Sequence, residues 1–250
     1  MKNKIITAVF LLIVFGMIFP SYNETPVTPT TNEVVKKEIS QPFVSWQKIE
    51  TTITEADQKI AIDINVPRVF LSDSSEKKRN LQNQVNNAIA RYVESLKDDF
   101  VRGVSTAAEN NGETNTLDIS TEILLNTPRL LSLAFTATGD MAGINDSDSE
   151  RTFLVFDWVN GELMRKGTEM FHDHSAWARA VEIVKPFLIS KYKGDLSCDL
   201  SYAPRPNGLA ASCIGVDWSQ GGSSFSVTGD VPIAMIQEFL SPSVLSDVVQ

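Results

Sequence analysis

Both histidines of the chain lie in one segment, His172-Asp173-His174. Alternate side chains of an extended segment point the same way, so the two imidazoles could bind one metal ion. Zinc needs three or four protein ligands, however, and no third ligand is identifiable. The segment also precedes a predicted helix that Asp173 or Ser175 is suited to cap. His172, Asp173 and His174 are therefore weak metal candidates, and a helix cap is the favoured interpretation.

An acidic run, Asp146-Ser147-Asp148-Ser149-Glu150, places carboxylates at alternate positions, as at the start of a calcium-binding loop. It lacks the glycine at the sixth position and the distal bidentate glutamate of such a loop. We interpret the run as a solvated loop between two strands.

Other catalytic signatures are incomplete in the sequence. A serine three residues before a lysine occurs at Ser45, Ser74 and Ser75, but no Ser-Asp-Asn or Lys-Thr-Gly motif accompanies it. There is no Gly-x-Ser-x-Gly, phosphate-binding loop or Gly-x-Gly-x-x-Gly motif. We therefore expect no catalytic residues, no cofactor and a protein that is not an enzyme. The tryptophans are Trp46, Trp158, Trp177 and Trp218. We interpret them as core or strand-face residues, and we expect Trp218 to face solvent.

Cys198 and Cys213 are the only cysteines, and they flank a predicted hairpin turn at Pro204–Gly208. A register that pairs Cys198 with Cys213 also pairs Tyr202 with Leu209. In an oxidising compartment we predict a disulfide, which would contribute about 3 kcal/mol by closing a loop of about sixteen residues. Two buried free thiols are the alternative.

The N-terminus predicts export. Lys2 and Lys4 precede an uncharged apolar run, Ile5–Phe19, which suits a signal-peptide core and is a little short of the ~17–25 residues of a spanning helix. The following residues, Phe19 to Asn23, lack a good cleavage motif, so an uncleaved anchor is favoured. No cysteine is near enough for lipid attachment. We expect a single-pass protein of the cell membrane with its globular part extracytoplasmic, or a secreted protein if the segment is cleaved.

Composition excludes some partners and supports a folded core. The formal net charge is −9, and the densest basic stretch, Lys77-Lys78-Arg79, is only three residues long. Such a surface repels nucleic acid, so no nucleic-acid partner is expected. Apolar residues make up 42% of the chain, which is enough for a globular core.

The chain divides into four predicted parts. Residues 1–22 form the anchor, and residues 23–42, rich in threonine and proline, form a linker of extended backbone. Residues 43–170 and 171–250 are predicted to form an N-terminal and a C-terminal α+β domain.

Periodicity predicts antiparallel sheets, two main helices and a short C-terminal helix, which is an α+β fold. Ile49 to Ile53 and Ile60 to Val66 alternate with period two, and Pro67 ends this second strand or marks an edge. Asn160-Gly161 predicts a hairpin turn. Further strands are expected at Leu117–Leu125, Leu130–Thr138, Arg151–Val159, Leu196–Tyr202, Leu209–Asp217 and Ser223–Thr228, and helices at Ser75–Phe100, Ser175–Tyr192 and Pro232–Leu240.

Several short motifs resemble the paired extracytoplasmic domains of PdaC- and RsiV-type proteins. They are the helix segment Gln84–Ile89, the strand Leu130–Phe135, the strand–turn–strand Phe156–Leu163 with Thr168–Phe171 after it, and Val231–Leu240 at the end. The resemblance covers roughly residues 46–240. It implies a non-catalytic module that sits beside a deacetylase domain or a membrane-anchored anti-sigma segment, and that binds lysozyme in RsiV-like proteins.

The chain departs from that pattern in two respects. Gly139–Ile144 replaces the family's Gly-Gly-Ala-His loop and lacks its histidine, so lysozyme binding is not carried over. We also expect neither a deacetylase domain nor a cytoplasmic sigma-binding region. The resulting hypothesis is a membrane-tethered extracytoplasmic binding or sensing module, whose partner is an envelope protein or a cell-wall component. The alternatives are an envelope hydrolase or metal-dependent enzyme that uses the His172/His174 region, and a structural assembly subunit of unknown oligomeric state.

Overall fold

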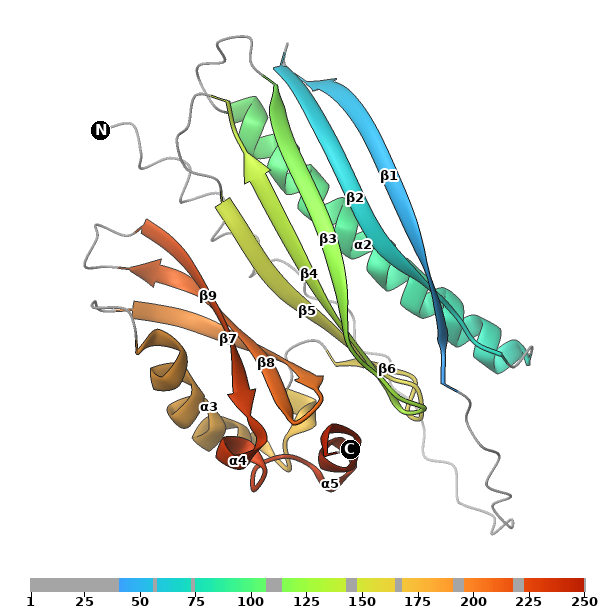
Figure 1. Cartoon of the computed structure of the whole chain (residues 1–250), viewed down its shortest axis with the longest axis vertical. Coiled ribbons are helices and arrows are strands. Elements are labelled where there is room, and N and C mark those ends of the chain that lie inside the picture. Colours follow the sequence, from blue (N-terminus) through green and yellow to red (C-terminus); the bar gives the residue numbers. More distant parts are fainter. Residues whose placement is uncertain are drawn as a thin grey trace, which may run out of the picture.

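The described parts of the chain form four layers of helix, sheet, sheet and helix (Figure 1). Helix α2 (Glu76–Thr106) covers one face of a six-stranded sheet, and a three-stranded sheet packs against part of the other face. Helix α3 (His174–Ile189) packs on the three-stranded sheet. The computed structural model describes residues 41–55, 58–72, 75–106, 114–142, 148–164, 168–190, 196–217 and 223–249.

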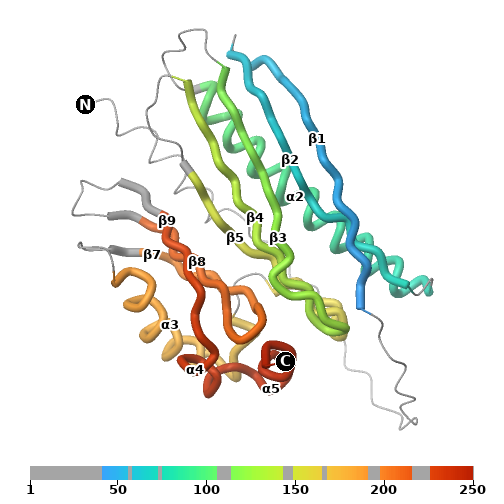
Figure 2. Tube along the Cα trace, viewed as in Figure 1, coloured from blue at the N-terminus to red at the C-terminus, as the bar shows by residue number. Residues whose placement is uncertain are grey.

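The six strands of the large sheet lie in chain order, with β1 at one edge (Figure 2). The predicted pairing of the first two strands is confirmed, with Ile49 opposite Ile64 and Ile53 opposite Ile60. The predicted Asn160-Gly161 hairpin is also confirmed, and Gly161 takes the positive φ of 72° that favours glycine. The strands are β1 (Phe43–Glu55), β2 (Gln58–Phe70), β3 (Asn115–Asn126), β4 (Leu130–Asp140), β5 (Asp148–Asp157) and β6 (Glu162–Met164).

The α+β class is confirmed, but the expectation of antiparallel sheets is wrong at one place. β2 and β3 run parallel, with Ile60 opposite Asn115 and Asn65 opposite Ser120. Helix α2 connects them as a crossover, which a parallel pair requires because its two strands start at the same end of the sheet. The apolar stripe of α2 packs on the inner face of the sheet and forms one of two cores.

The predicted edge at Pro67 is present, although the strand continues to Phe70. The ladder with β3 ends at Asn65, so the rest of β2 has no strand on that side. The side-chain amide of Asn86 on α2 takes the place of the missing strand: its Oδ1 accepts from the Val69 N–H and its Nδ2 donates to the Val69 carbonyl, both at 2.9 Å. These bonds attach α2 to the sheet edge.

The second core lies between the two sheets and α3. β8 is the central strand of the small sheet, and residues Leu209 to Cys213 are buried without alternation because both faces are covered. Its strands are β7 (Leu196–Arg205), β8 (Gly208–Asp217) and β9 (Ser223–Pro232).

The predicted disulfide Cys198–Cys213 is confirmed, but the predicted register of its hairpin is wrong by two residues. Asn207 has a left-handed φ of 62° and closes a two-residue turn, so pairing extends to Arg205 opposite Gly208. Cys198 consequently lies opposite Gly215 and Cys213 opposite Leu200. The two cysteines are diagonal neighbours with a Cα–Cα distance of 5.5 Å, and Gly215 has no side chain to block the bridge.

The C-terminal helix differs from the prediction. The region Pro232–Leu240 contains only one turn, α4 (Ile233–Ile236), and a second short helix follows, α5 (Pro242–Val248). Leu240 forms an isolated bridge with Phe171, which requires extended backbone and separates the two helices. A 3-10 turn, η1 (Thr168–Met170), leads into Phe171.

Residues 1–40, which hold the predicted anchor and all but the last two residues of the predicted linker, lie outside the described residues. Among the described helices, none is long and apolar enough to cross a membrane. The Ala56–Asp57 turn and Trp218 also lie outside the described part.

Candidate functional site

The histidine segment lies at the start of α3 and acts there as a cap. Asp173 is the N-cap residue, and its Oδ1 accepts from the Ala176 N–H at 2.8 Å. The His172 N–H donates to the Phe239 carbonyl, and the His174 ring lies 5.0 Å from the Trp177 ring between centroids. Within the described residues no cluster of three potential metal ligands exists, so the structure supplies no third ligand here.

Only the second part of the acidic run, Asp148 to Glu150, belongs to the described residues. Asp146 and Ser147 lie outside them, whereas Asp148 to Glu150 belong to β5 and pair with Gly139 to Ala137 of β4. The predicted loop is therefore shorter than expected, because the ladder extends into its second half.

Glu150 belongs to a first candidate cluster on the α2 side of the sheet, with Asp99 and Tyr92. Burial, and next to it the Asp99 carboxylate, raise the pKa of Glu150. Burial chiefly raises the pKa of Asp99 too, and the Arg102 guanidinium 3.3 Å away opposes this shift. The Tyr92 hydroxyl bonds to Thr152, and burial raises the pKa of Tyr92 far above its usual range. Two carboxyl groups with raised pKa values could exchange protons, but the pair lines neither the groove over β1, β2 and β3 nor the small cavity between α2, β4 and β5.

Glu150→Gln is expected to raise the free energy of unfolding at neutral pH. The pKa of Glu150 in the folded state lies above its unfolded value of 4.5. The protonated Glu150 therefore stabilises the folded state below pH 4.5, and this stabilisation is lost as the pH rises through the folded-state pKa. Glutamine cannot ionise and escapes this loss. Denaturant unfolding at neutral pH and below pH 4.5 measures the effect. Glu182→Gln on the exposed side of α3 is the control. A variant no more stable than wild type at neutral pH would contradict the expectation.

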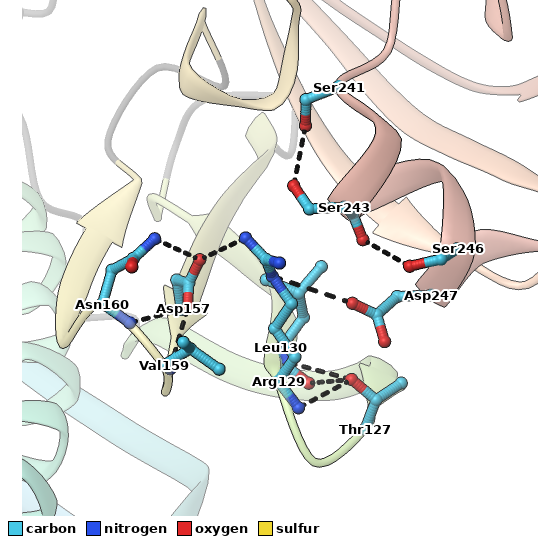
Figure 3. Close-up of polar contacts among 10 residues, drawn as sticks. All are labelled: Thr127, Arg129, Leu130, Asp157, Val159, Asn160, Ser241, Ser243, Ser246 and Asp247. Atoms are coloured by element: carbon cyan, nitrogen blue, oxygen red, sulfur yellow. Dashed lines mark hydrogen bonds and ion pairs between the residues drawn. The ribbon is translucent and has the colours of Figure 1, made fainter. Parts of the chain in front are cut away.

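A second cluster, not anticipated from the sequence, surrounds Asp157 where the two cores meet (Figure 3). Asp157 is fully buried, and its carboxylate accepts from Nη2 of Arg129 at 3.0 Å. It also accepts from the backbone of Val159 and Asn160 at 2.8 and 3.0 Å, and from the Asn160 side chain at 3.0 Å. Four donors satisfy the buried charge, as such a charge requires.

Asp247 of α5 approaches the same arginine from the other side, with its Oδ2 3.9 Å from Arg129 Nε. Burial raises the pKa of Asp247, whereas the nearby Thr127 hydroxyl and the charge of Arg129 lower it. Arg129 thereby links the C-terminal helix to the hairpin of the large sheet. Arg129 Nε and Asp247 Oδ2 are buried and make no hydrogen bond, so their contact is weaker than that between Arg129 and Asp157. Because the charged groups of this cluster contact one another and join α5 to the large sheet, we interpret it as structural.

The third candidate is a groove of about 580 Å³ on the outer face of the large sheet, over β1, β2 and β3. The small sheet contacts β3, β4 and β5, and so leaves the β1 side of this face open (Figure 1). The outer-face side chains that line the groove come in pairs from the three strands: Glu50 and Thr52, Ala61 and Asp63, Thr116 and Asp118.

The groove is acidic because its three carboxylates lie in one row. Glu50 is opposite Asp63, and Asp63 is opposite Asp118. Lys48 contacts two of them, with Nζ 2.5 Å from Glu50 and 3.2 Å from Asp63. The hydrogen bond to Glu50, and to a smaller extent the one to Asp63, raises the pKa of Lys48. Within the described residues Asp118 has no ion-pair partner. An open hollow with threonine hydroxyls and excess negative charge suits a ligand that donates hydrogen bonds.

Sequence reasoning did not find this groove. The alternation of β1 and β2 already places Glu50 and Asp63 on the outer face. Asp118 joins them only through the parallel pairing of β2 with β3, which the sequence did not reveal.

The fold resembles solved structures of DUF3298 family proteins, which are domains of unknown function. One from Bacteroides fragilis has a TM-score of 0.50 and 11% identity, with 85% of this chain and 99% of that chain covered. One from Pseudomonas aeruginosa PAO1 has a TM-score of 0.48 and 9% identity, with 80% of this chain and 96% of that chain covered. No protein-family model and no curated protein matches the sequence. The Bacteroides likeness shows a shared fold and nothing about activity.

Proposed function

We propose that this chain is a membrane-tethered, extracytoplasmic module that binds or senses an envelope protein or a cell-wall component without catalysis. The groove over β1–β3 carries the proposal, since it is an open hollow with polar side chains on a rigid sheet. The N-terminal sequence supports the location, because Lys2 and Lys4 precede the apolar run Ile5–Phe19. The disulfide also fits an oxidising compartment.

The PdaC/RsiV-like resemblance is compatible with this proposal and gives it a domain context. In that view the large sheet with α2 corresponds to the N-terminal domain and the small sheet with α3 to the C-terminal one. The rival function, an envelope hydrolase or metal enzyme at His172 and His174, lacks a specific observation in its favour, since Asp173 serves as the helix cap.

A groove variant tests the proposal. Ala61 lies half-buried on the groove floor, and Ala61→Arg would fill the hollow and reverse part of its charge. The purified full chain in detergent would be offered peptidoglycan fragments and envelope proteins separately. We expect specific retention of one class, weakened at least about tenfold by Ala61→Arg, which corresponds to about 1.4 kcal/mol of binding free energy.

Ala178→Arg is the matched control, because Ala178 is also half-buried but lies on α3, away from the groove. It should leave binding unchanged. Failure of wild type to retain either class, or equal loss in both variants, would count against the groove as the binding site.

A further inference from the structure

The outer edge of β1 is a long strand edge without a partner in the described parts of the chain. β1 spans Phe43–Glu55, thirteen residues, and pairs only through its other edge with β2 (Figure 2). The ladder to β2 has no bulge, and the strand contains no proline. Proteins commonly protect such an edge with bulges, prolines, charged side chains or a covering segment, because free N–H and C=O groups recruit another strand. Within the strand itself only charged side chains are present, those of Lys48, Glu50 and Glu55.

The side chains of β1 add apolar surface to this edge. Phe43 and Ile49 on one face of β1 are 66% and 38% exposed, and Trp46 on the other face is 48% exposed. Apolar side chains at a free edge lower the free energy of a second strand that covers them. Affinity in such an addition comes from main-chain hydrogen bonds, and side chains select the partner.

The sequence of β1 is complementary to itself in one antiparallel register. Strands related by a two-fold axis at Ile49 place Lys48 of each copy opposite Glu50 of the other, on the same face of the sheet. Ile49 then faces Ile49, and Gln47 faces Thr51. Shifting the axis to Gln47 puts Lys48 opposite Trp46, and shifting it to Thr51 puts Glu50 opposite Thr52, so neither register pairs opposite charges.

We propose that β1 pairs antiparallel with β1 of a second copy of this chain, about a two-fold axis at Ile49. The two large sheets then continue into one another, with both α2 helices on one side and both grooves on the other. Lys48 already contacts Glu50 and Asp63 of its own chain, and exposed ion pairs contribute little energy. Lys48 and Glu50 therefore set the register, while the backbone hydrogen bonds and the contact between the two Ile49 side chains hold the pair. The charge of −9 on each copy opposes association, so contact is confined to this self-complementary edge. The pairing requires no ligand in the groove, although Glu50 lies in both.

Cysteine cross-linking of the full chain tests the register directly. Ile49→Cys places two thiols opposite one another across the axis, at a separation from which a disulfide forms readily. The native cysteines are already bridged and do not interfere. We expect Ile49→Cys to form covalent dimers on mild oxidation. Ile183→Cys on α3 is the matched control, since Ile183 is also an isoleucine that is 38% exposed, and this variant should form no covalent dimer.

Two further variants make the test specific. Gln47→Cys should cross-link with Thr51→Cys when the two chains are mixed, but each should cross-link poorly with itself. Ile49→Lys puts two positive charges at the axis and should convert a dimer, measured by light scattering, into a folded monomer with wild-type circular dichroism. A wild-type chain that stays monomeric across a concentration series overturns the proposal. The proposal is also overturned if Ile49→Cys forms no more covalent dimer than Ile183→Cys. Cross-linking of position 49 to a different protein would overturn it as well.

Discussion

Asp157→Ala is expected to lower the free energy of unfolding by about 3–5 kcal/mol, because it leaves the partly buried Arg129 guanidinium without its main partner. The substitution also removes the acceptor of two backbone N–H groups, those of Val159 and Asn160, in the turn between β5 and β6. Urea unfolding at neutral pH, followed by circular dichroism, measures the change.

Asp230→Ala is the matched control for this prediction. Asp230 also pairs with an arginine, Arg205, but its side chain is 66% exposed. An exposed ion pair contributes about 0.2–1 kcal/mol, so this variant should remain close to wild type. Equal losses of unfolding free energy in Asp157→Ala and Asp230→Ala would show that burial of the Asp157 cluster does not increase its contribution to stability.

A double-mutant cycle separates the pair energy from the cost of an unpaired charge. Arg129→Met in the Asp157→Ala background removes the orphaned guanidinium and should recover part of the loss. Arg129→Met alone should be severe, because it leaves the fully buried Asp157 carboxylate without its cation. The coupling between the two sites then reports how strongly Arg129 fixes the turn.

Local patterns in the sequence were sufficient for most of the elements. Ile60 to Val66 alternate because only one face of β2 is packed against α2, and the stripe from Leu81 to Phe100 repeats with the helical period for the same reason. The cap at Asp173 and the turn at Gly161 follow from chemistry that acts within a few residues.

The remaining features depend on contacts between distant parts of the chain. The parallel pairing of β2 with β3 needs α2 as a crossover, and nothing in either strand indicates which neighbour it takes. Asp118 joins Glu50 and Asp63 in the groove only through that pairing, so in the sequence it looks like an ordinary surface residue. The buried Asp157 similarly acquires its partner from another hairpin.

The small-sheet hairpin shows how a two-residue turn can override a plausible pattern. A register with Cys198 opposite Cys213 is consistent with the neighbouring side chains, yet Asn207 adopts the left-handed conformation and closes a two-residue turn that shifts the register by two residues. The disulfide survives this shift because diagonal neighbours on one face can still be bridged, here with a Cα–Cα distance of 5.5 Å.

Removing the disulfide with Cys198→Ala/Cys213→Ala should lower the free energy of unfolding by about 2–4 kcal/mol. The bridge joins residues 15 apart, and a loop of that length corresponds to about 3 kcal/mol of chain entropy in the unfolded state. Alanine is preferred to serine because Cys213 is fully buried, and an unpaired hydroxyl there would add its own desolvation cost.

Reduction of the wild-type protein provides the control for that double variant, since it removes the covalent bond without changing the sequence. The reduced chain and the alanine variant should unfold at similar denaturant concentrations, both below the oxidised chain. The m-value should rise slightly, because an unfolded chain free of the cross-link exposes more surface. Mass mapping without reductant should join the peptides that contain Cys198 and Cys213. If both thiols of the isolated protein alkylate fully, the bridge does not form, and the stability difference between variant and wild type should then fall to the small cost of truncating two side chains.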